Sequence, residues 1–427
     1  MTKKIVTLDG IHNVMTGIGS SYSKRSNNHY DFTPMNCQQQ LEAAYRSDWL
    51  PRAIVDYPVE DMTREWRSFK CIDADKLQDA EREYRIRSVT EEALRWARLY
   101  GGSGIVMLTD QPLDQPLDVN KIRKGSLKNL IVFDRYTLSA PVLNLHNPLS
   151  SNYMLPECYY VHGGSQRIHH SHVVRFTGAP LPLRLKMMTS GWGDSELRKA
   201  IDQVMDYTAG MAGIAELMAE ANVDIITRDG LTDEIATDQE GAIIQRYAAF
   251  NQMKSVVQMA LLDGEETYDR KTLNLSGVAP IIEMFMTACC GATGIPMTRL
   301  FGIQAAGLGN EGKGDMNNYH NHLRSKQTSQ LDPSMWYLDQ VFVRSALGTY
   351  PTDYSYMWNP LEQLNGKEVQ DERKLQAERD LLYLQAGVVT VSQVQRNLQQ
   401  CEVYQFDDSE IEALAQAEGL YEEEETQ

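Results

Sequence analysis

A glycine-rich stretch that runs from Gly291 to about Gln330 constrains the fold of this chain more than any other feature. It follows an apolar run with helical spacing, APIIEMFMTACC, and seven glycines fall between positions 291 and 314. Glycine allows positive φ and flexibility, at a cost in conformational order. Because a loop longer than about 12–15 residues inside a compact domain is usually functional or disordered, we expect a long, mobile loop between two helices.

This loop carries apolar and amide side chains that do not suit a solvated linker. We therefore expect it to meet a partner or a ligand. Its candidate contact residues are Met297, Arg299, Leu300, Phe301, Ile303, Gln304, Asn310 and Lys313. The two cations of this set, Arg299 and Lys313, are the candidates for a phosphate contact or for a salt bridge between subunits.

The spacing from Gly307 to Gly314, GxxxxGKG, is close to that of a phosphate-binding loop. Such a loop follows a buried strand and has Ser or Thr after its lysine to hold Mg²⁺. Here Gly314 follows Lys313, and the preceding residues FGIQAA do not form a strand pattern. A nucleotide-binding hydrolase that uses Lys313 is therefore the alternative hypothesis, and we expect no cofactor.

The charge of the chain limits its partners. Lys and Arg number 41 against 58 Asp and Glu, which gives a net charge of −17. This balance argues against wrapping nucleic acid through a basic surface, although it permits a wall past which DNA slides. No run of 18 apolar residues exists, and the N-terminus lacks an apolar signal region. We expect no membrane span and no signal peptide.

The six cysteines are scattered and form no CxxC motif. This pattern indicates neither a zinc site nor a disulfide framework, and it fits a reducing compartment. Cys289 and Cys290 lie next to each other in an apolar helical run, so we expect a buried structural pair.

Residues 37–192 combine helices and strands. We expect a buried helical face at Ile54, Val55 and Tyr57, and one charged helix from Asp73 to Leu99, ended by Gly101. The strand patterns are SGIVMLTD, LKNLIVFD, ECYYVH and HVVRFTG.

Three histidines, His169, His170 and His172, fall at the step from a turn to the last of these strands. Alternation along a strand would place His170 and His172 on one face. We interpret this step as a structural turn, and a metal hydrolase is the alternative.

A long helix is expected after this region. Asp194 or Ser195 is a good N-cap, and the following apolar stripe predicts about 26 helical residues, near 40 Å in length. The stripe residues expected to pack against like helices are Leu197, Ile201, Val204, Met211 and Met218. A β-α-β-β insert then separates this helix from the one that leads into the glycine-rich loop.

The C-terminal third is expected to be mainly helical. A helix over 315–347 should kink or restart at Pro333. Gly387 should cap a later helix, and Thr390 with Gln393 forms a capping-box pattern at the start of the next.

Three pieces of the sequence, in this order, resemble phage portal proteins, which form the ring at one vertex of a tailed-phage capsid. They are IHHSHVVRFTG followed by GWGDSELRKAIDQV, then ACCGATGIPMTRLFG, and then GKGDMNNYHNHLRSKQTSQLDPSMWYLD. The likeness spans about residues 90–410.

The resemblance implies an α+β, ring-forming subunit with a portal-like architecture. Its parts would be a flexible N-terminal arm (1–36), the first part of the wing (37–192), stem helix 1 (193–221), a β-α-β-β clip (222–277), stem helix 2 (278–294), a tunnel loop (295–313), a long kinked helix with the second part of the wing (314–360), a helical crown (361–420) and an acidic tail (421–427).

The resemblance also implies the function and the partners. A ring of about twelve copies would pass double-stranded DNA during packaging and ejection, and would contact the terminase large subunit, tail adaptor or connector proteins and the major capsid protein. It would lie in the virion at a capsid vertex after assembly in the host cytoplasm. The loop residues named above would face DNA, and Asp233, Glu234 and Arg270 would belong to the clip docking surface.

Under this reading the chain has no catalytic site of its own. The competing hypotheses are an enzyme that uses Lys313 or the histidine cluster, and a capsid or tail adaptor that lacks the order of stem, clip and stem.

Overall fold

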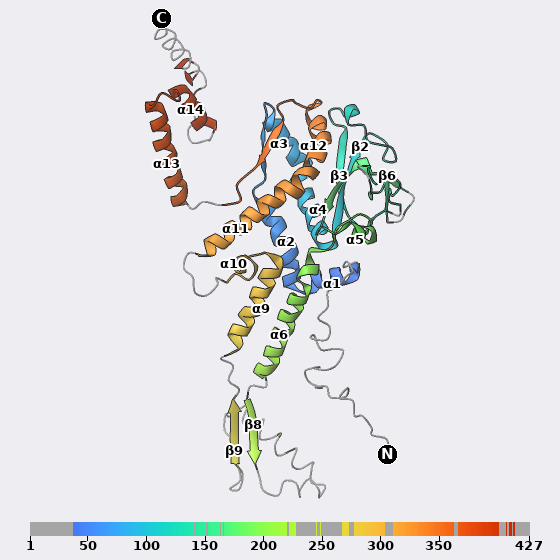
Figure 1. Ribbon diagram of the computed structural model, residues 1–427, viewed down its shortest axis with the longest axis vertical. Helices are drawn as coiled ribbons and strands as arrows, with labels where there is room; N and C mark the ends of the chain where they lie inside the picture. Colours follow the sequence, from blue (N-terminus) through green and yellow to red (C-terminus); the bar gives the residue numbers. More distant parts are fainter. Residues whose placement is uncertain are drawn as a thin grey trace. The chain divides into compact units, whose positions relative to one another are not determined.

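The computed structural model describes residues 37–140, 142–150, 153–162, 164, 166–219, 222–227, 267–272, 277–303, 311–362 and 366–400, with single residues 245, 248, 407, 410, 411, 413 and 414. The chain divides into two compact units, one ending at Leu361 and the other beginning at Glu362. The first unit combines helices and antiparallel sheets (Figure 1), so the predicted α+β class is confirmed.

Two helices open the first unit. Helix α1 spans Gln38–Ser47 and α2 spans Trp49–Arg64, and the Asp48 carboxylate caps α2 by accepting from the Leu50 amide at 3.0 Å. The predicted buried face of α2 is confirmed, because Ile54 and Val55 are almost fully buried and Tyr57 packs against the same core.

The expected single helix from Asp73 to Leu99 is wrong. Two helices form instead, α3 (Ala74–Glu83) and α4 (Ile86–Tyr100), because Arg85 between them has a φ of 51°. A left-handed residue cannot continue a right-handed helix. Gly101 ends α4 with a φ of 85°, as predicted, and a Cβ there would lie 2.6 Å from the Gly193 carbonyl oxygen.

Two small antiparallel sheets follow α4. In the first, β2 (Gly102–Thr109) lies between β3 (Leu127–Asp134) and β7 (Val173–Thr177); in the second, β5 (Cys158–Val161) lies between β4 (Leu138–Ser139) and β6 (Arg167–His169). The four predicted strands are therefore confirmed. Short turns accompany them: η1 (Val119–Lys121), η2 (His170–His172) and α5 (Leu183–Met188).

A buried ion-pair network joins distant parts of this unit. The Arg67 guanidinium donates to Glu81 at 2.9 Å and to both Asp339 oxygens at 2.6 and 2.9 Å. Arg67 lies in β1 (Arg67–Lys70), which pairs antiparallel with β10 (Ser355–Trp358). The network thus fixes chain segments separated by more than 250 residues.

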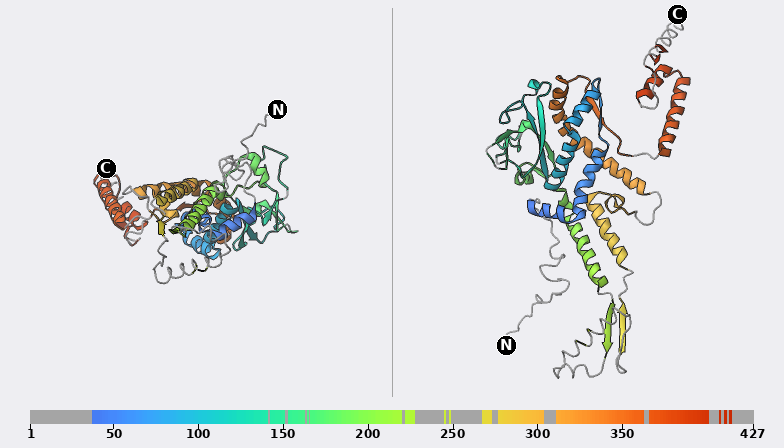
Figure 2. Two further views of the ribbon diagram at one scale, coloured as in Figure 1. Left: turned by 90° about the horizontal axis from the view of Figure 1, so that it is seen from below. Right: turned by 180° about the vertical axis from the view of Figure 1, so that it is seen from behind.

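Helices α6 (Ile201–Ala219) and α9 (Val278–Thr293) lie side by side, as the two views in Figures 1 and 2 show. The predicted length of 26 residues for the first is wrong. Ser195 caps a separate 3₁₀ turn, η3 (Glu196–Lys199), and α6 begins only at Ile201. The second helix is confirmed.

The insert between these helices is described only in part. Strands β8 (Asn222–Thr227) and β9 (Thr267–Thr272) pair antiparallel, so the first and last expected strands are confirmed. The expected strand over 255–264 lies outside the described residues. So does the helix expected over 239–253, apart from residues 245 and 248, which are helical.

The predicted restart at Pro333 is confirmed. Helix α11 (Glu311–Lys326) passes into a π-helical segment, η4 (Gln327–Leu331), and Pro333 lies in the first turn of α12 (Asp332–Leu347). Proline is tolerated there because its missing N–H is not needed in the first turn.

The second unit contains α13 (Gly366–Gln385) and α14 (Val391–Gln400). Gly387 has a φ of 67°, and the Thr390 amide donates to the Gln393 side chain at 3.2 Å. Both predicted caps are confirmed. Among the helices that the structure describes, none is long and apolar enough to cross a lipid bilayer.

Candidate functional site

The beginning of the predicted loop is a short helix. Helix α10 spans Met297–Leu300, and Leu300 is only 2% exposed. The expectation that Leu300 is a contact residue of the loop is wrong, because its side chain is buried in the same core cluster as Ile295. Ile303 is 52% exposed. Gln304 and Asn310 lie outside the described residues, and Lys313 is described only as a backbone position of α11.

Arg299 is held by an intrachain ion pair. Its guanidinium donates to the two Asp61 oxygens at 3.0 and 3.1 Å and stacks over the Tyr57 ring at 4.0 Å. The Tyr319 hydroxyl donates to the same carboxylate at 3.0 Å. We call Asp61, Arg299 and Tyr319 the Asp61 cluster. Arg299 is thus already paired in this structure, a partner that the sequence reading did not foresee.

The pKa values follow from this geometry. Burial alone would lower the pKa of Arg299, but the hydrogen bonds and the charge of Asp61 outweigh it and raise that pKa. Burial, with Asp61 adding to it, raises the pKa of Tyr319. Both groups therefore keep the protonation states in which they donate to Asp61.

An aromatic contact continues the base of the loop. The Phe301 ring makes edge contacts with Trp49 of α2 and Tyr207 of α6, with centroid distances of 5.7 and 5.5 Å. Cys289 of α9 is fully buried beneath them and Cys290 is partly buried, as expected of a structural pair. Burial, with a contribution from Cys289, raises the pKa of Cys290 to about 11.

The predicted stem residues divide into two groups. Leu197 and Val204 are buried in the core and Ile201 is partly buried, whereas Met211 and Met218 are 40% and 61% exposed. Further exposed apolar side chains on α6 and α9 are Met205, Leu217, Ile281 and Met284. Within the described residues, the helix pair thus leaves these apolar side chains exposed.

A charged cluster lies where η3 meets α11. The buried Glu196 carboxylate pairs with Lys199 at 2.7 Å. Burial alone would raise the pKa of Glu196, but Arg98, Lys326 and Lys199 together lower it to about 2. Burial lowers the pKa of Lys326 to about 8. No spacing pattern predicts this cluster, because Glu196 and Lys199 lie far along the chain from Arg98 and Lys326.

The alternative hypothesis of a phosphate-binding loop at Lys313 lacks its structural context. A loop of that class follows a strand and opens a helix, whereas α9 and α10 precede this one. The arrangement therefore disfavours a Walker-type site at Lys313.

His170 and His172 lie in the 3₁₀ turn η2, and His169, the last residue of β6, directly precedes it, so the structural-turn interpretation is confirmed and the shared strand face is wrong. His169 contacts the Ser171 hydroxyl at 2.8 Å, and His172, fully buried, contacts the Gln115 carbonyl at 3.1 Å. Burial lowers the pKa of both imidazoles. Within the described ranges, no group of three or more His, Cys, Asp or Glu side chains is arranged to hold a metal ion.

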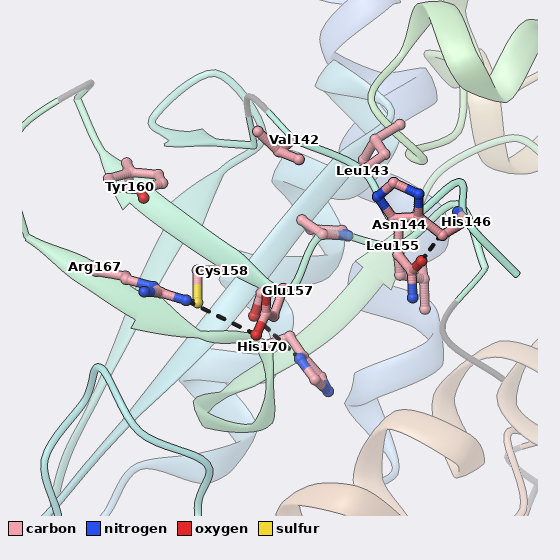
Figure 3. Close-up of a pocket in the computed structure, with 11 residues that line it drawn as sticks. Val142, Leu143, Asn144, His146, Leu155, Glu157, Cys158, Tyr160, Arg167 and His170 are labelled. Atoms are coloured by element: carbon pink, nitrogen blue, oxygen red, sulfur yellow. Dashed lines mark hydrogen bonds and ion pairs between the residues drawn. The ribbon is translucent and has the colours of Figure 1, made fainter. Parts of the chain in front are cut away.

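A cavity of about 470 Å³ opens beside β5 and β6 (Figure 3). On its wall the Arg167 guanidinium donates to the Cys158 sulfur at 2.9 Å, and the His170 ring lies 3.1 Å from the Glu157 carbonyl oxygen. These polar groups are paired with one another.

The predicted docking residues of the insert are described only in part. Asp233 and Glu234 lie outside the described residues. Arg270 pairs with Asp224 in the β8–β9 ladder, and its side chain is not described.

A family model described as phage portal protein matches residues 39–382. The chain is 32% identical over 393 residues, 88% of its length, to an anti-CBASS protein Acb1 of Caulobacter sp. (strain RHG1), and 30% identical over 92% of its length to a protein of that name from Sphingomonas paeninsulae. It spans only 62% and 64% of these two relatives. An uncharacterized protein of Haemophilus influenzae is 28% identical, with 92% of this chain and 90% of that protein covered.

Solved structures show the same fold. The neck of an empty GTA particle aligns with a TM-score of 0.53 and 17% identity, covering 86% of this chain and 94% of the other. The virion of a native gene transfer agent (GTA) particle aligns with a TM-score of 0.50 and 15% identity, covering 88% and 97%. The neck of a native GTA particle computed with C12 symmetry has a TM-score of 0.50, 16% identity and coverages of 84% and 93%.

Proposed function

The chain belongs to the phage portal protein family, and from this premise we propose that about twelve copies form a ring around a channel for double-stranded DNA at one vertex of a phage-like head. The ring would serve DNA packaging and ejection, and would dock the terminase large subunit and then tail adaptor proteins. The major capsid protein would surround it in the virion, after assembly in the host cytoplasm.

The observation that carries the ring is the uncovered apolar surface of α6 and α9. Met211 and Met218 lie seven residues apart on one helix face, and Met284 of the partner helix is 69% exposed. Soluble monomers rarely leave contiguous apolar patches of this kind without a binding partner. Copies of the same helix pair are the partners that a closed ring supplies, and the C12 symmetry named for one structural neighbour supports the number twelve.

The glycine-rich segment is our candidate for the channel constriction. Its base is fixed by the Asp61 cluster and by Phe301, so the part free to reach a channel begins near Ile303. We assign the contacts to DNA to Ile303, Gln304, Asn310 and Lys313. Twelve copies at −17 each give the ring about −200 charges, and a wall of like charge repels phosphate rather than holding it.

The remaining domain assignments follow the order of the chain. Helices α6 and α9 form the stem, and residues 222–277 between them form the clip. Docking of terminase and adaptors is assigned to this clip, with Asp233, Glu234 and Arg270 as its candidate contacts. Residues 362–427 form the crown and the acidic tail.

Portal proteins are structural parts of the phage particle, and we propose that this chain has no catalysis of its own. The helical context of Lys313 and the paired histidines support this proposal. ATP hydrolysis during packaging would then belong to the terminase.

The printed name of two relatives refers to a different role, anti-CBASS. More than a third of each relative lies outside the match, whereas the Haemophilus influenzae relative is matched over 90% of its length. The portal family model covers residues 39–382 of this chain. We therefore place the anti-CBASS role in the unmatched part of those two relatives.

Native mass spectrometry with negative-stain imaging tests the ring. The wild-type chain should give a ring of about a dozen copies, and Met211→Glu with Met218→Glu should abolish it, because twenty-four carboxylates would enter an apolar interface. Leu149→Glu is the matched control, since Leu149 is 95% exposed but lies outside α6 and α9. A double variant that forms the same ring as the control would refute the stem interface.

A further inference from the structure

An arginine-rich groove lies at the C-terminal end of α2. It encloses about 690 Å³ between the last turn of α2, strand β1 and the junction of α3 and α4. Four exposed arginines line it, and we call them the arginine groove: Arg64, Arg82, Arg85 and Arg87. Such a concentration of guanidinium groups contrasts with the net charge of −17 of the chain.

The carboxylates that line this groove already have cationic partners. Glu65 lies 3.8 Å from Arg64, Glu81 lies 2.9 Å from the buried Arg67, and Glu91 lies 2.8 Å from Arg95. They therefore do not neutralise the arginines at the junction of α3 and α4.

The arginines at this junction, Arg82, Arg85 and Arg87, form few ion pairs. Arg82 makes a 3.4 Å contact to Asp79, and both side chains are more than 70% exposed, so water screens this pair. Arg87 donates to a neutral acceptor, the Arg64 carbonyl, at 2.9 Å. No hydrogen bond or ion pair of the Arg85 side chain occurs within the described part of the chain. Arg85 also precedes α4 without capping it by a side-chain hydrogen bond, and an uncapped helix N-terminus favours anions.

The position of the arginine groove on the first unit indicates which ligand it binds. The N-terminal end of α2 meets the stem, where Thr208 donates to Asp48 at 3.1 Å. The groove lies at the other end of this 16-residue helix, about 24 Å away. There Arg64 donates to the carbonyl of Leu361, the last residue of the first unit, at 2.6 Å. Given the proposed function, on which this inference rests, residues 362–427 form a crown inside the capsid, so that end of the wing would face the packaged genome.

We propose that the arginine groove binds the phosphate backbone of double-stranded DNA outside the channel. Guanidinium groups match phosphate oxygens in a bidentate geometry. An open groove lined by flexible, exposed arginines suits a backbone of regular charge and requires no base sequence. The packaged DNA nearest the ring would thus be held at its wing.

Closed circular DNA provides the test, because a circle without ends cannot thread a channel. We would measure its binding to the assembled full-length chain between about 50 and about 200 mM salt. Arg82→Gln, Arg85→Gln and Arg87→Gln together should weaken binding at least tenfold. They should also reduce the slope of log K against log salt by about 2.7, which is 0.9 for each lost phosphate contact.

The matched control neutralises three exposed arginines elsewhere, Arg123, Arg184 and Arg373, and should retain wild-type binding. Equal binding by the two triple variants, or no binding of the circle by the wild type at about 50 mM salt, would overturn the proposal. The proposal would also be overturned if polyglutamate displaced the bound DNA at a lower concentration than DNA of equal charge does. That result would indicate an acidic protein as the partner. Loss of the ring in the groove variant alone would make these arginines a subunit contact. If the ring packages DNA normally but does not bind circular DNA, the proposal for the arginine groove is wrong and the proposed portal function stands.

Discussion

Replacement of Asp61 by alanine tests how the base of the glycine-rich loop is held. One carboxylate, 6% exposed, accepts two hydrogen bonds from Arg299 and one from Tyr319. Alanine removes all three acceptors at once. Arg299 then loses its bidentate partner, and the Tyr319 hydroxyl, on a residue that is 3% exposed, is left in the core without an acceptor.

The expected cost follows from these contacts. A buried hydroxyl without a partner costs about 1–3 kcal/mol, and a hydrogen bond to a charged group contributes about 1.5–3 kcal/mol. The Arg299 side chain is 29% exposed and lies 3.6 Å from Glu60, so contacts with water and Glu60 offset part of the hydrogen-bond energy that Arg299 loses. We therefore expect Asp61→Ala to lower the free energy of unfolding of the first unit by about 3 kcal/mol. Glu60→Ala should lower it by less than about 0.5 kcal/mol, because Glu60 is exposed.

Urea denaturation followed by tryptophan fluorescence measures this difference. All six tryptophans precede Glu362, so the signal reports the first unit and not the second. Limited proteolysis gives a second readout, because release of α10 should speed cleavage near Gly302. The reasoning is refuted if Asp61→Ala and Glu60→Ala unfold at the same urea concentration, or if cleavage near Gly302 is unchanged.

Two further predictions concern the charged cluster and the loop itself. The pKa of Glu196 is lowered from 4.5 to about 2, so the unfolded chain binds more protons between these values, and stability should fall as the pH drops through this window. Glu196→Gln should lower the free energy of unfolding by about 2–3 kcal/mol at neutral pH, and it should flatten the fall in stability in acid denaturation curves. If the variant loses stability with falling pH as steeply as the wild type, the lowered pKa of Glu196 does not cause that fall. Deletion of residues 304–309 should leave the ring intact but give heads that fail to package or retain DNA, whereas normal packaging would exclude this segment as the channel constriction.

Local signals in the sequence predicted much of the fold. The strands β2, β3, β5 and β7 follow from apolar runs bounded by turn residues, and Gly101 and Gly387 end helices because both positions require a positive φ. These features depend on residues that are close in the chain. Periodicity and turn chemistry therefore suffice to find them.

The failures share a physical cause. The break at Arg85 has no sequence signal, because arginine rarely adopts the left-handed backbone, with a φ of 51°, that it has here. The position of Arg299 depends on Asp61, 238 residues away, and no local pattern links the two. The apolar residues beside glycines predict loop contacts that include Leu300, but Leu300 lies in the core. Long-range pairing thus decided which part of the glycine-rich stretch is fixed.

The boundary between the fixed base of the glycine-rich stretch and the residues after Gly302 determines which contacts a movement of this segment would break. Asp61 belongs to α2, Tyr319 to α11 and Arg299 to α10, while Phe301 contacts α2 and α6. A movement of the loop that begins after Gly302, which has a φ of 71°, leaves all of these contacts intact. A movement that begins earlier must break the Asp61 cluster and disturb the contacts of Phe301 with α2 and α6. The Asp61→Ala variant separates these two modes, because only the second should become easier when the carboxylate is removed.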